Sequence, residues 1–362
     1  MKNSKPFMKS VVTIARTGSR DPKERLSALK RLLARTDPFS AYREGSFVPI
    51  KLTVGDAPCV THADPALAGL IVSEMKKRGA KPFLFDTSVI YQGARQNAVD
   101  HLNLAQAKGF GHAAVGAPFI IADGVFGQDG KEHLIGAKDI RAIKIPSFVG
   151  MVDDLFVLSH VTGHIVSRYA GAVKNVAMGM SCRPTKQVQH SSLKPGVIET
   201  KCTACGLCVA VCPVRAIAFA GPGKRPRIDQ TVCVGCGECI CACKFDAVSI
   251  NWEEDPHTFC RRMVEVARFV LSRFKNVFFV NAAWDMTKEC DCISTKDDSI
   301  VADDVGILAS RDIVSLEKAT TDLIRKGGRS DFFARKSDIY GRMLEHAASQ
   351  GLGSLEYDLV EA

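Results

Sequence analysis

The chain has 362 residues, of which 46% are hydrophobic and 24% charged, a composition typical of globular proteins with a sizeable core. Its formal net charge is +9, but the basic residues are scattered, so the charge gives no reason to expect nucleic-acid binding. We expect no membrane span, because no apolar run is long enough, and no secretory signal at the N-terminus. Fourteen cysteines in such a chain indicate a reducing cytoplasm and metal or redox chemistry rather than a disulfide scaffold.

The first 195 residues alternate strand-like and helix-like segments, a pattern that predicts an α/β fold with a largely parallel sheet. The predicted strands are Ser10–Ala15, Phe47–Val54, Pro82–Asp86, Phe119–Ala122, Ile140–Ile145 and Leu155–Ser159. The predicted helices are Pro22–Ala34, Pro65–Arg78, Ala94–Lys108 and Gly171–Met178.

Four polar side chains follow the last of these strands: His160, His164, Lys174 and His190. Open α/β sheets bind ligands at the carboxyl ends of their strands, so these four are candidate catalytic residues. The histidines would transfer protons, and Lys174 would hold an anionic group or a cofactor. The alternative is that the histidines are merely hydrogen-bonded in loops.

Two cysteine runs, at residues 202–212 and 233–243, each fit C-x2-C-x2-C-x3-C. Two-residue gaps let a tight turn aim three thiolates at one 4Fe–4S cube, while the fourth cysteine leaves on a helical turn towards the other cube. We therefore predict a bacterial-type two-cluster ferredoxin domain that repeats after 31 residues; zinc binding is the alternative. The expected ligands are Cys202, Cys205, Cys208 and Cys243 for cluster one, and Cys233, Cys236, Cys239 and Cys212 for cluster two.

Two residues depart from this pattern. Lys244 stands where a proline usually follows the fourth cysteine, and the additional Cys241 could compete as a ligand of cluster one. Residues 201–250 also hold six basic and three acidic side chains. A basic cluster domain suits docking with an acidic electron carrier.

The chain after the cysteine runs continues the α/β pattern, with a helix at His257–Phe274, strands at Asn276–Asn281 and Ile300–Leu308, and a helix at Ile313–Lys326. Cys290 and Cys292 flank Asp291 after the first of these strands, and such a group could bind a metal ion. Unpaired loop cysteines are the alternative.

We expect one α/β domain, residues 1–195 and 253–362, with the ferredoxin domain inserted as residues 196–252. Three successive domains are the alternative. The sequence contains neither G-x-G-x-x-G after a strand nor G-x-x-x-x-G-K-[ST], so no motif supports Rossmann-type dinucleotide binding or P-loop chemistry.

Several segments together resemble the iron–sulfur-centre proteins of domain-of-unknown-function family 362, in the branch with a ferredoxin insert. The resemblance implies the fold and the clusters, and no reaction. Besides the two cysteine runs, the segments are DTSVIYQGAR (86–95), IIADG (120–124), LSHVTGH (158–164), GAVKNVAMGMSC (171–182), KQVQH (186–190), ECDC (289–292) and GILASRDIVSLEKA (306–319).

His164, Lys174 and His190 also resemble, more loosely, a motif of lactate racemases that carry a nickel-pincer nucleotide. In that family a lysine in a glycine-containing segment bonds the pincer, and histidines bind nickel or transfer protons. Here Ala172 replaces the second glycine, and His101 is the candidate counterpart of the first catalytic histidine.

These features predict an iron–sulfur electron-transfer protein, and as its first interpretation an oxidoreductase of unspecified substrate. Electrons would enter from an acidic ferredoxin-type or flavodoxin-type carrier or a partner oxidoreductase, cross two 4Fe–4S clusters and reach a site in the α/β domain. A non-catalytic electron-carrier subunit and a metal- or cofactor-handling protein are the alternatives.

Overall fold

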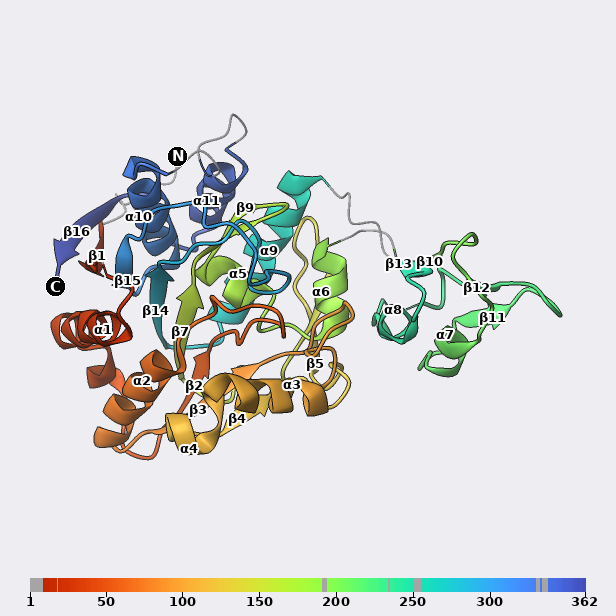
Figure 1. Cartoon of the computed structure of the whole chain (residues 1–362), viewed down its shortest axis with the longest axis horizontal. Helices are drawn as coiled ribbons and strands as arrows, with labels where there is room; N and C mark the ends of the chain where they lie inside the picture. Colours follow the sequence, from red (N-terminus) through yellow and green to blue (C-terminus); the bar gives the residue numbers. More distant parts are fainter. Residues whose placement is uncertain are drawn as a thin grey trace.

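The computed structural model describes residues 9–17, 19–190, 194–233, 235–249, 255–329, 333 and 338–362. Its body is an eight-stranded sheet with helices on both faces, and residues 196–249 form a smaller unit beside it (Figure 1). Among the described helices, none has the length and apolar character that a membrane crossing requires.

The large sheet is mostly parallel, which confirms the predicted α/β fold with a largely parallel sheet. Its only antiparallel pairs in the described residues are the two that β15 makes, with β1 and with β14. β7 and β14 pair in parallel although the small unit separates them in sequence, so the chain on both sides of that unit builds one sheet. In sheet order the strands are β16 (Tyr357–Glu361), β1 (Ser10–Ala15), β15 (Gly306–Ser310), β14 (Asn276–Ala283), β7 (Asp154–His160), β2 (Phe47–Lys51), β3 (Lys81–Asp86) and β4 (Phe119–Ile121).

The two faces of the sheet bury separate apolar cores. In β7, Leu155 and Val157 belong to one core while Phe156 and Leu158 belong to the other, because successive side chains of a strand point to opposite faces. One face is covered by α1 (Pro22–Thr36) and α2 (Pro65–Lys77), and the other by α5 (Ala172–Ala177), α9 (Pro256–Leu271), α10 (Ile313–Lys326) and α11 (Ile339–Ser349).

Three of these helices begin at an Asp-Pro pair. The carboxylates of Asp21, Asp64 and Asp255 accept hydrogen bonds from backbone N–H groups of the first turn, and the proline that follows each takes the first helical position. An N-terminal aspartate satisfies an otherwise unpaired N–H, and proline at that position loses no helical bond. This local chemistry explains why the sequence predicted the starts of α1 and α2 at the observed residues.

Several short elements connect the sheet to the candidate site. β8 and β9 form a hairpin that carries His164, and α6 ends at His190. The remaining elements of the body are a 3-10 helix (Pro38–Ala41), α3 (Ala98–Ala105), a π-helix (Gln106–Phe110), α4 (His112–Val115), β5 (Lys131–Leu134), β6 (Ala142–Ile145), β8 (Thr162–His164), β9 (Arg168–Ala170) and α6 (Arg183–His190).

The unit at residues 196–249 is a twofold repeat. Val197 pairs with Val248 and Ile217 with Ile228, and an offset of 31 residues converts one pair into the other. Its elements are β10 (Gly196–Val197), α7 (Leu207–Ala210), β11 (Ile217–Phe219), β12 (Pro226–Ile228), α8 (Glu238–Ala242) and β13 (Val248–Ser249). In Figure 1, α8 lies on the side of the unit that faces the body, and α7 lies farther away.

Some predicted elements were wrong in extent or place. The expected strand Ile300–Leu308 begins only at Gly306, because the carboxylates of Asp303 and Asp304 accept backbone N–H bonds and hold the preceding residues in a loop. The helix expected from Ala94 starts at Ala98, after an Asn97 cap, and continues into a π-helix. The strand expected at Ile140–Ile145 pairs with β5 in a separate hairpin.

Candidate functional site

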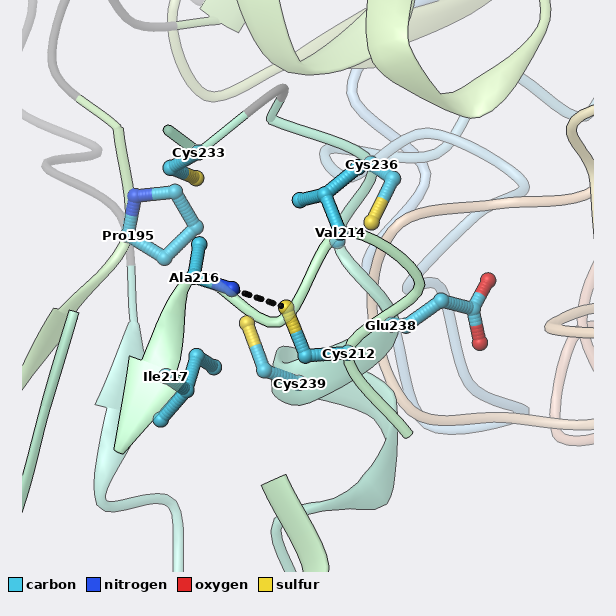
Figure 2. A pocket seen from close by; sticks show the side chains of 10 residues that line it. Pro195, Cys212, Val214, Ala216, Ile217, Cys233, Cys236, Glu238 and Cys239 are labelled. Carbon is cyan, nitrogen blue, oxygen red and sulfur yellow. Dashed lines mark hydrogen bonds between the residues drawn. The ribbon is translucent and has the colours of Figure 1, made fainter. Parts of the chain in front are cut away.

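Two hollows in the small unit are each lined by four cysteines (Figure 2 shows the second). The first encloses about 320 Å³ and the second about 300 Å³ of empty space, part of it open to solvent. Each hollow combines three cysteines from one run with a fourth from the other, so the lining residues are the two ligand sets expected from the spacing. The first is lined by Cys202, Cys205, Cys208 and Cys243, and the second by Cys233, Cys236, Cys239 and Cys212.

The backbone around both hollows follows the same repeat. The N–H of Ala204 donates to the sulfur of Cys202 at 3.4 Å, and that of Gly235 donates to Cys233 at 3.4 Å. Positive φ angles also recur at this offset, so the chain takes the same turns in both halves. They occur at Ala204 and Gly235, Gly206 and Gly237, and Arg215 and Asp246.

These residues fit a pair of 4Fe–4S clusters. A cubane spreads its four thiolates over four irons, and the N–H groups that already point at the sulfurs are the donors that stabilise such a cluster. Within the described residues, no three His, Cys, Asp or Glu side chains converge as they do around a single metal ion.

Cys241 lines neither hollow, so the structure gives no support to its competition for cluster one. Its sulfur instead faces the body, where it contacts the guanidinium of Arg183 and lies 3.9 Å from the carbonyl oxygen of Tyr91. Burial raises the pKa of this thiol to about 11.

The small unit is joined to the body by buried polar contacts. The side chain of Arg183, which is almost fully buried, pairs with Glu238 and donates to the carbonyl oxygen of Gly237 at 3.1 Å. Gln92 donates to the carbonyl oxygen of Cys243, and Ile90 packs into the small apolar cluster that contains Cys239. The loop at residues 90–92 therefore lies directly against the cysteine-rich unit.

A second group of polar side chains lies at the carboxyl edge of the parallel strands. Lys51, Asp86 and His160 are the last residues of β2, β3 and β7, and Cys290 and Cys292 follow β14. Strands that run parallel end at the same edge, which is why residues from distant parts of the sequence gather there.

Cys292 and Lys174 are in contact at this edge, with the lysine nitrogen 3.6 Å from the sulfur. A hydrogen bond from the Cys290 thiol lowers the pKa of Cys292, whereas burial raises it. The cations Lys174 and Arg95 lower the pKa further, so that it lies well below the usual range of a cysteine. The same hydrogen bond raises the pKa of Cys290. Cys292 is therefore the thiolate of the pair and Cys290 the thiol.

Lys174 remains charged in this environment. Burial alone would lower the pKa of its ammonium group, but the sulfurs of Cys290 and Cys292 raise it above its ordinary value. The contact between Lys174 and Cys292 places the lysine and the C-x-C cysteines in one site. The sequence alone did not show whether these residues lie together.

His164 and His190 border the same site as neutral rings. Burial, and then the charge of Lys174, lower the pKa of both, to about 3 for His190. The Nδ1 atom of His164 accepts N–H bonds from Val166 at 3.2 Å and Ser167 at 3.1 Å, which places the ring proton on Nε2. Since neither ring nitrogen of His164 then offers a lone pair, this geometry does not fit a nickel ligand at that residue.

His160 has a different environment. Its Nε2 lies 2.8 Å from the carbonyl oxygen of Trp284, which can only accept, and its Nδ1 lies 3.0 Å from a carboxylate oxygen of Asp291. Burial would lower the pKa of His160, but Asp291 outweighs it and raises the pKa. Both nitrogens therefore act as donors, and we interpret His160 as a residue that positions Asp291 rather than one that accepts protons. Asp291 faces away from the two sulfurs that flank it, so Cys290 and Cys292 as metal ligands stay a prediction.

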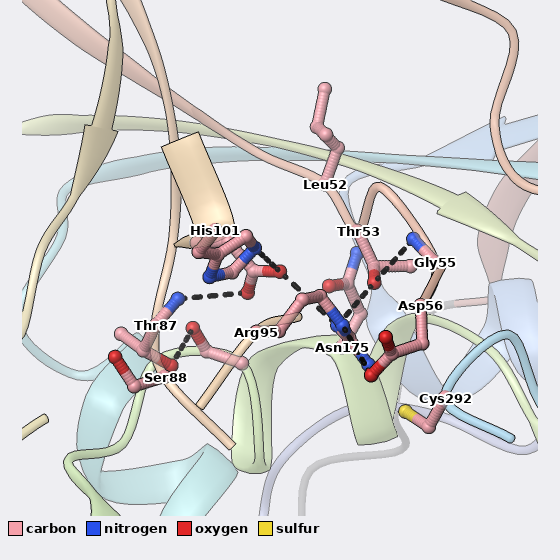
Figure 3. A network of polar contacts seen from close by, with 12 residues as sticks. Leu52, Thr53, Gly55, Asp56, Thr87, Ser88, Arg95, His101, Asn175 and Cys292 are labelled. Carbon is pink, nitrogen blue, oxygen red and sulfur yellow. Dashed lines mark hydrogen bonds and ion pairs between the residues drawn. The ribbon is translucent and has the colours of Figure 1, made fainter. Parts of the chain in front are cut away.

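A buried charge network adjoins the thiolate and was missed by the sequence analysis (Figure 3). Lys51 lies 3.0 Å from Asp86, and the guanidinium of Arg95 lies 3.5 Å from the same carboxylate. Arg95 also donates to the hydroxyl of Tyr91 at 2.7 Å, and this hydroxyl in turn hydrogen-bonds Cys292. Tyr91 therefore contacts Cys241 of the small unit with its backbone and Cys292 of the body with its side chain.

A family model described as "Domain of unknown function (DUF362)" matches residues 48–322, most of the chain. This chain belongs to the DUF362 family. No protein with a curated function matches the sequence.

Two solved structures resemble this DUF362 protein weakly. One is the lactate racemase apoprotein from Thermoanaerobacterium thermosaccharolyticum (13% identity, TM-score 0.40, 77% of this chain and 51% of that one). The other is a crystal structure of a protein from Thermotoga maritima (11% identity, TM-score 0.42, 90% of this chain and 59% of that one). The chain thus spans between half and three fifths of the length of these proteins, and likenesses at this level carry no argument about function.

One sequence signal could have found the missed network in this DUF362 protein. The predicted strands at Phe47–Val54 and Pro82–Asp86 contain no charged residues except Lys51 and Asp86. A charge inside an apolar strand is rarely buried without a partner. An opposite pair in two such strands therefore predicts the contact that the structure shows.

Proposed function

We propose that this DUF362 protein is an iron–sulfur oxidoreductase that passes electrons through two 4Fe–4S clusters to the Cys292–Lys174 site. The observation that carries this proposal is the crosswise lining of the two hollows, each with three cysteines of one run and one of the other. A chance cluster of reduced cysteines has no reason to exchange one member between two repeats, whereas the two-cluster ferredoxin arrangement requires it.

The clusters, when bound, would supply one-electron transfer, and the chain's own residues would set its direction. Cys205 is exposed at the first hollow, so electrons would enter there. The second hollow lies nearer the body, where Arg183 contacts the neighbouring residues Gly237 and Glu238. A buried cation beside a negatively charged cluster favours its reduced form, which would draw electrons towards the body.

The loop at residues 90–92 supports the remaining path. Gln92 contacts Cys243, and Ile90 packs with Cys239. The backbone carbonyl of Tyr91 contacts Cys241, and the hydroxyl of Tyr91 contacts the sulfur of Cys292. This loop connects the two candidate sites through adjoining residues and hydrogen bonds, so the body site would be the end of the path.

The surface of the small unit suits an acidic one-electron carrier of the ferredoxin or flavodoxin class. Its basic side chains are all exposed, while one of its few acidic residues, Glu238, is neutralised by Arg183. The surplus of positive charge would steer an acidic partner to the exposed first hollow. The exposed basic residues are Lys201, Arg215, Lys224, Arg225, Arg227 and Lys244.

The body site favours an enzyme over a non-catalytic carrier subunit. A charged lysine, a stabilised thiolate and neutral buried histidines converge there, and such perturbed groups are characteristic of catalytic sites. A carrier subunit would have no need for a thiolate at the end of the path.

Anaerobic mixing with a reduced ferredoxin tests the proposal. The purified protein should be brown, and the carrier should bleach its visible absorbance with uptake of two electrons per chain. Cys205→Ser and Cys236→Ser should each lose half of that uptake, whereas Cys260→Ser, a buried cysteine of α9, should keep it. Colourless, iron-poor protein, or clusters that no acidic carrier reduces, would overturn the proposal.

A further inference from the structure

The pair Cys290 and Cys292 has the geometry of a dithiol that can close. The two cysteines lie in a turn in which the N–H groups of Ile293 and Ser294 both donate to the carbonyl oxygen of Cys290 at 2.9 Å. A turn brings residues two apart closer than an extended chain does. A short separation of the two Cα atoms is what a disulfide requires of the backbone.

The surroundings leave the two sulfurs free to react with each other. The carboxylate of Asp291, which lies between them in sequence, points away to His160 at 3.0 Å and to the sulfur of Cys59 at 3.8 Å. The nitrogen of Lys174 lies 3.6 Å from the sulfur of Cys292. The charge of Lys174 interacts with both sulfurs of the pair.

We propose that Cys290 and Cys292 cycle between a disulfide and a dithiol, and that this pair accepts the electrons delivered by the small unit. The inference rests on the proposed function and names the acceptor at the end of its path. Two clusters, each a one-electron carrier, match the two electrons that one disulfide takes.

The disulfide takes two electrons, one from each cluster, and one proton from solvent. Its sulfur–sulfur bond breaks, Cys290 becomes a thiol, and Cys292 becomes a thiolate paired with Lys174. Cys292, which is partly exposed while Cys290 is buried, then attacks a disulfide substrate. Cys290 displaces the bound half, which returns the protein disulfide; the proton of Cys290 and one proton from solvent convert the two released halves into thiols.

The chain offers a clean readout of this cycle. Trypsin cleaves after Lys288 and after Lys296, and the peptide between them contains Cys290 and Cys292 and no other cysteine. In the intact, cluster-loaded protein, treatment with diamide should make this peptide lighter by two hydrogen atoms and resistant to N-ethylmaleimide. Removal of diamide and addition of reduced ferredoxin should restore two alkylatable thiols.

Variants separate this inference from the function on which it rests. Cys205→Ser and Cys236→Ser should block reduction of the pair by ferredoxin but not by dithiothreitol, whereas Cys260→Ser should change neither. Lys174→Met should shift the dithiol–disulfide equilibrium at least tenfold towards the disulfide, because the thiolate loses its cation. This shift corresponds to a reduction potential lower by ~30 mV for a two-electron couple.

Two results would overturn the inference in distinguishable ways. If the peptide keeps two free thiols in diamide and in oxidised glutathione while the clusters remain intact, the pair is not redox-active and the electron-transfer function stands. If the pair closes and reopens with dithiothreitol in protein that contains no iron, the proposed function fails and ferredoxin cannot be its reductant.

Discussion

Lys174 and Cys292 lie 118 residues apart in sequence, and the nitrogen of one is 3.6 Å from the sulfur of the other. The sheet explains the contact, because α5 follows β7 and the C-x-C loop follows β14, and these two strands pair in parallel. Both segments therefore leave the sheet at the same edge. The charge of Lys174 adds to the effect of the Cys290 thiol, and together they lower the pKa of Cys292.

Removal of this cation should raise the pKa of Cys292. Below the pKa of a thiol, each unit of increase reduces the thiolate fraction tenfold. We expect Lys174→Met to slow alkylation of the reduced Cys292 by iodoacetamide at pH 6 by about tenfold or more. Lys296→Met, which removes an exposed charge from the same loop, is the matched control and should leave the rate unchanged. Equal rates in the two variants would show that Lys174 does not stabilise the thiolate.

Arg183 should make the reduction potentials of the two clusters differ. Its guanidinium is buried against Gly237 and Glu238, beside the second hollow. Arg183→Gln should lower the potential of that cluster by ~30–60 mV, because a cation that favours the reduced form is lost. The exposed Arg215→Gln is the control. A redox titration followed by electron paramagnetic resonance resolves the two clusters, and an equal shift of both, or of neither, would contradict this account.

His101 should make the protein sensitive to acid. Burial lowers its pKa to about 3 in the folded protein, although nearby Asp86 opposes the shift. An unfolded histidine has a pKa near 6.5, so the stability that the neutral ring contributes is present above that pH and is lost as the pH falls towards 3.

Between pH 6.5 and pH 5 this loss amounts to about 2 kcal/mol. His101→Gln should flatten the pH dependence of the free energy of unfolding by that amount, measured by urea denaturation at both pH values. His112→Gln, at an exposed position, should leave the dependence unchanged. If the free energy of unfolding of His101→Gln depends on pH as steeply as that of the parent protein, His101 is not the source of the acid sensitivity.

Reduction by an acidic carrier should depend on salt. The basic residues of the small unit are exposed, and screening weakens attraction between surface charges as ionic strength rises. We expect Lys224→Glu with Arg225→Glu to slow the second-order reduction by ferredoxin about tenfold at low salt. The difference in reduction rate between this variant and the parent protein should become smaller at high salt. Identical rates for the two proteins at low salt would place the docking surface elsewhere.

The sequence predicted best what is encoded in local spacing. The cysteine runs predicted which four cysteines line each hollow, because each run folds on itself and the 31-residue repeat exchanges Cys212 and Cys243; their role as cluster ligands stays a prediction. The predicted starts of α1 and α2 at Pro22 and Pro65 were correct, and the structure shows Asp21 and Asp64 capping both helices. These signals depend on neighbouring residues only.

Contacts between distant segments could not be predicted in the same way. The meeting of Lys174 with Cys292 depends on which strands are neighbours, and β14 lies beside β7 only because the chain returns to the sheet after the small unit. The role of Tyr91 depends on how that unit packs against the body. His160 showed no sign in sequence of the two acceptors that occupy its nitrogens.

The crosswise ligand sets are tested most directly by iron and acid-labile sulfide analysis of anaerobically purified Cys212→Ser, Cys243→Ser and Cys241→Ser. The parent protein should hold eight irons in two 4Fe–4S clusters, and Cys212→Ser and Cys243→Ser should each lose one cluster, the second and the first respectively. Cys241→Ser should retain both, since its sulfur faces Arg183 and Tyr91. Full iron content in Cys212→Ser and Cys243→Ser, or an iron-free parent protein, would contradict the account.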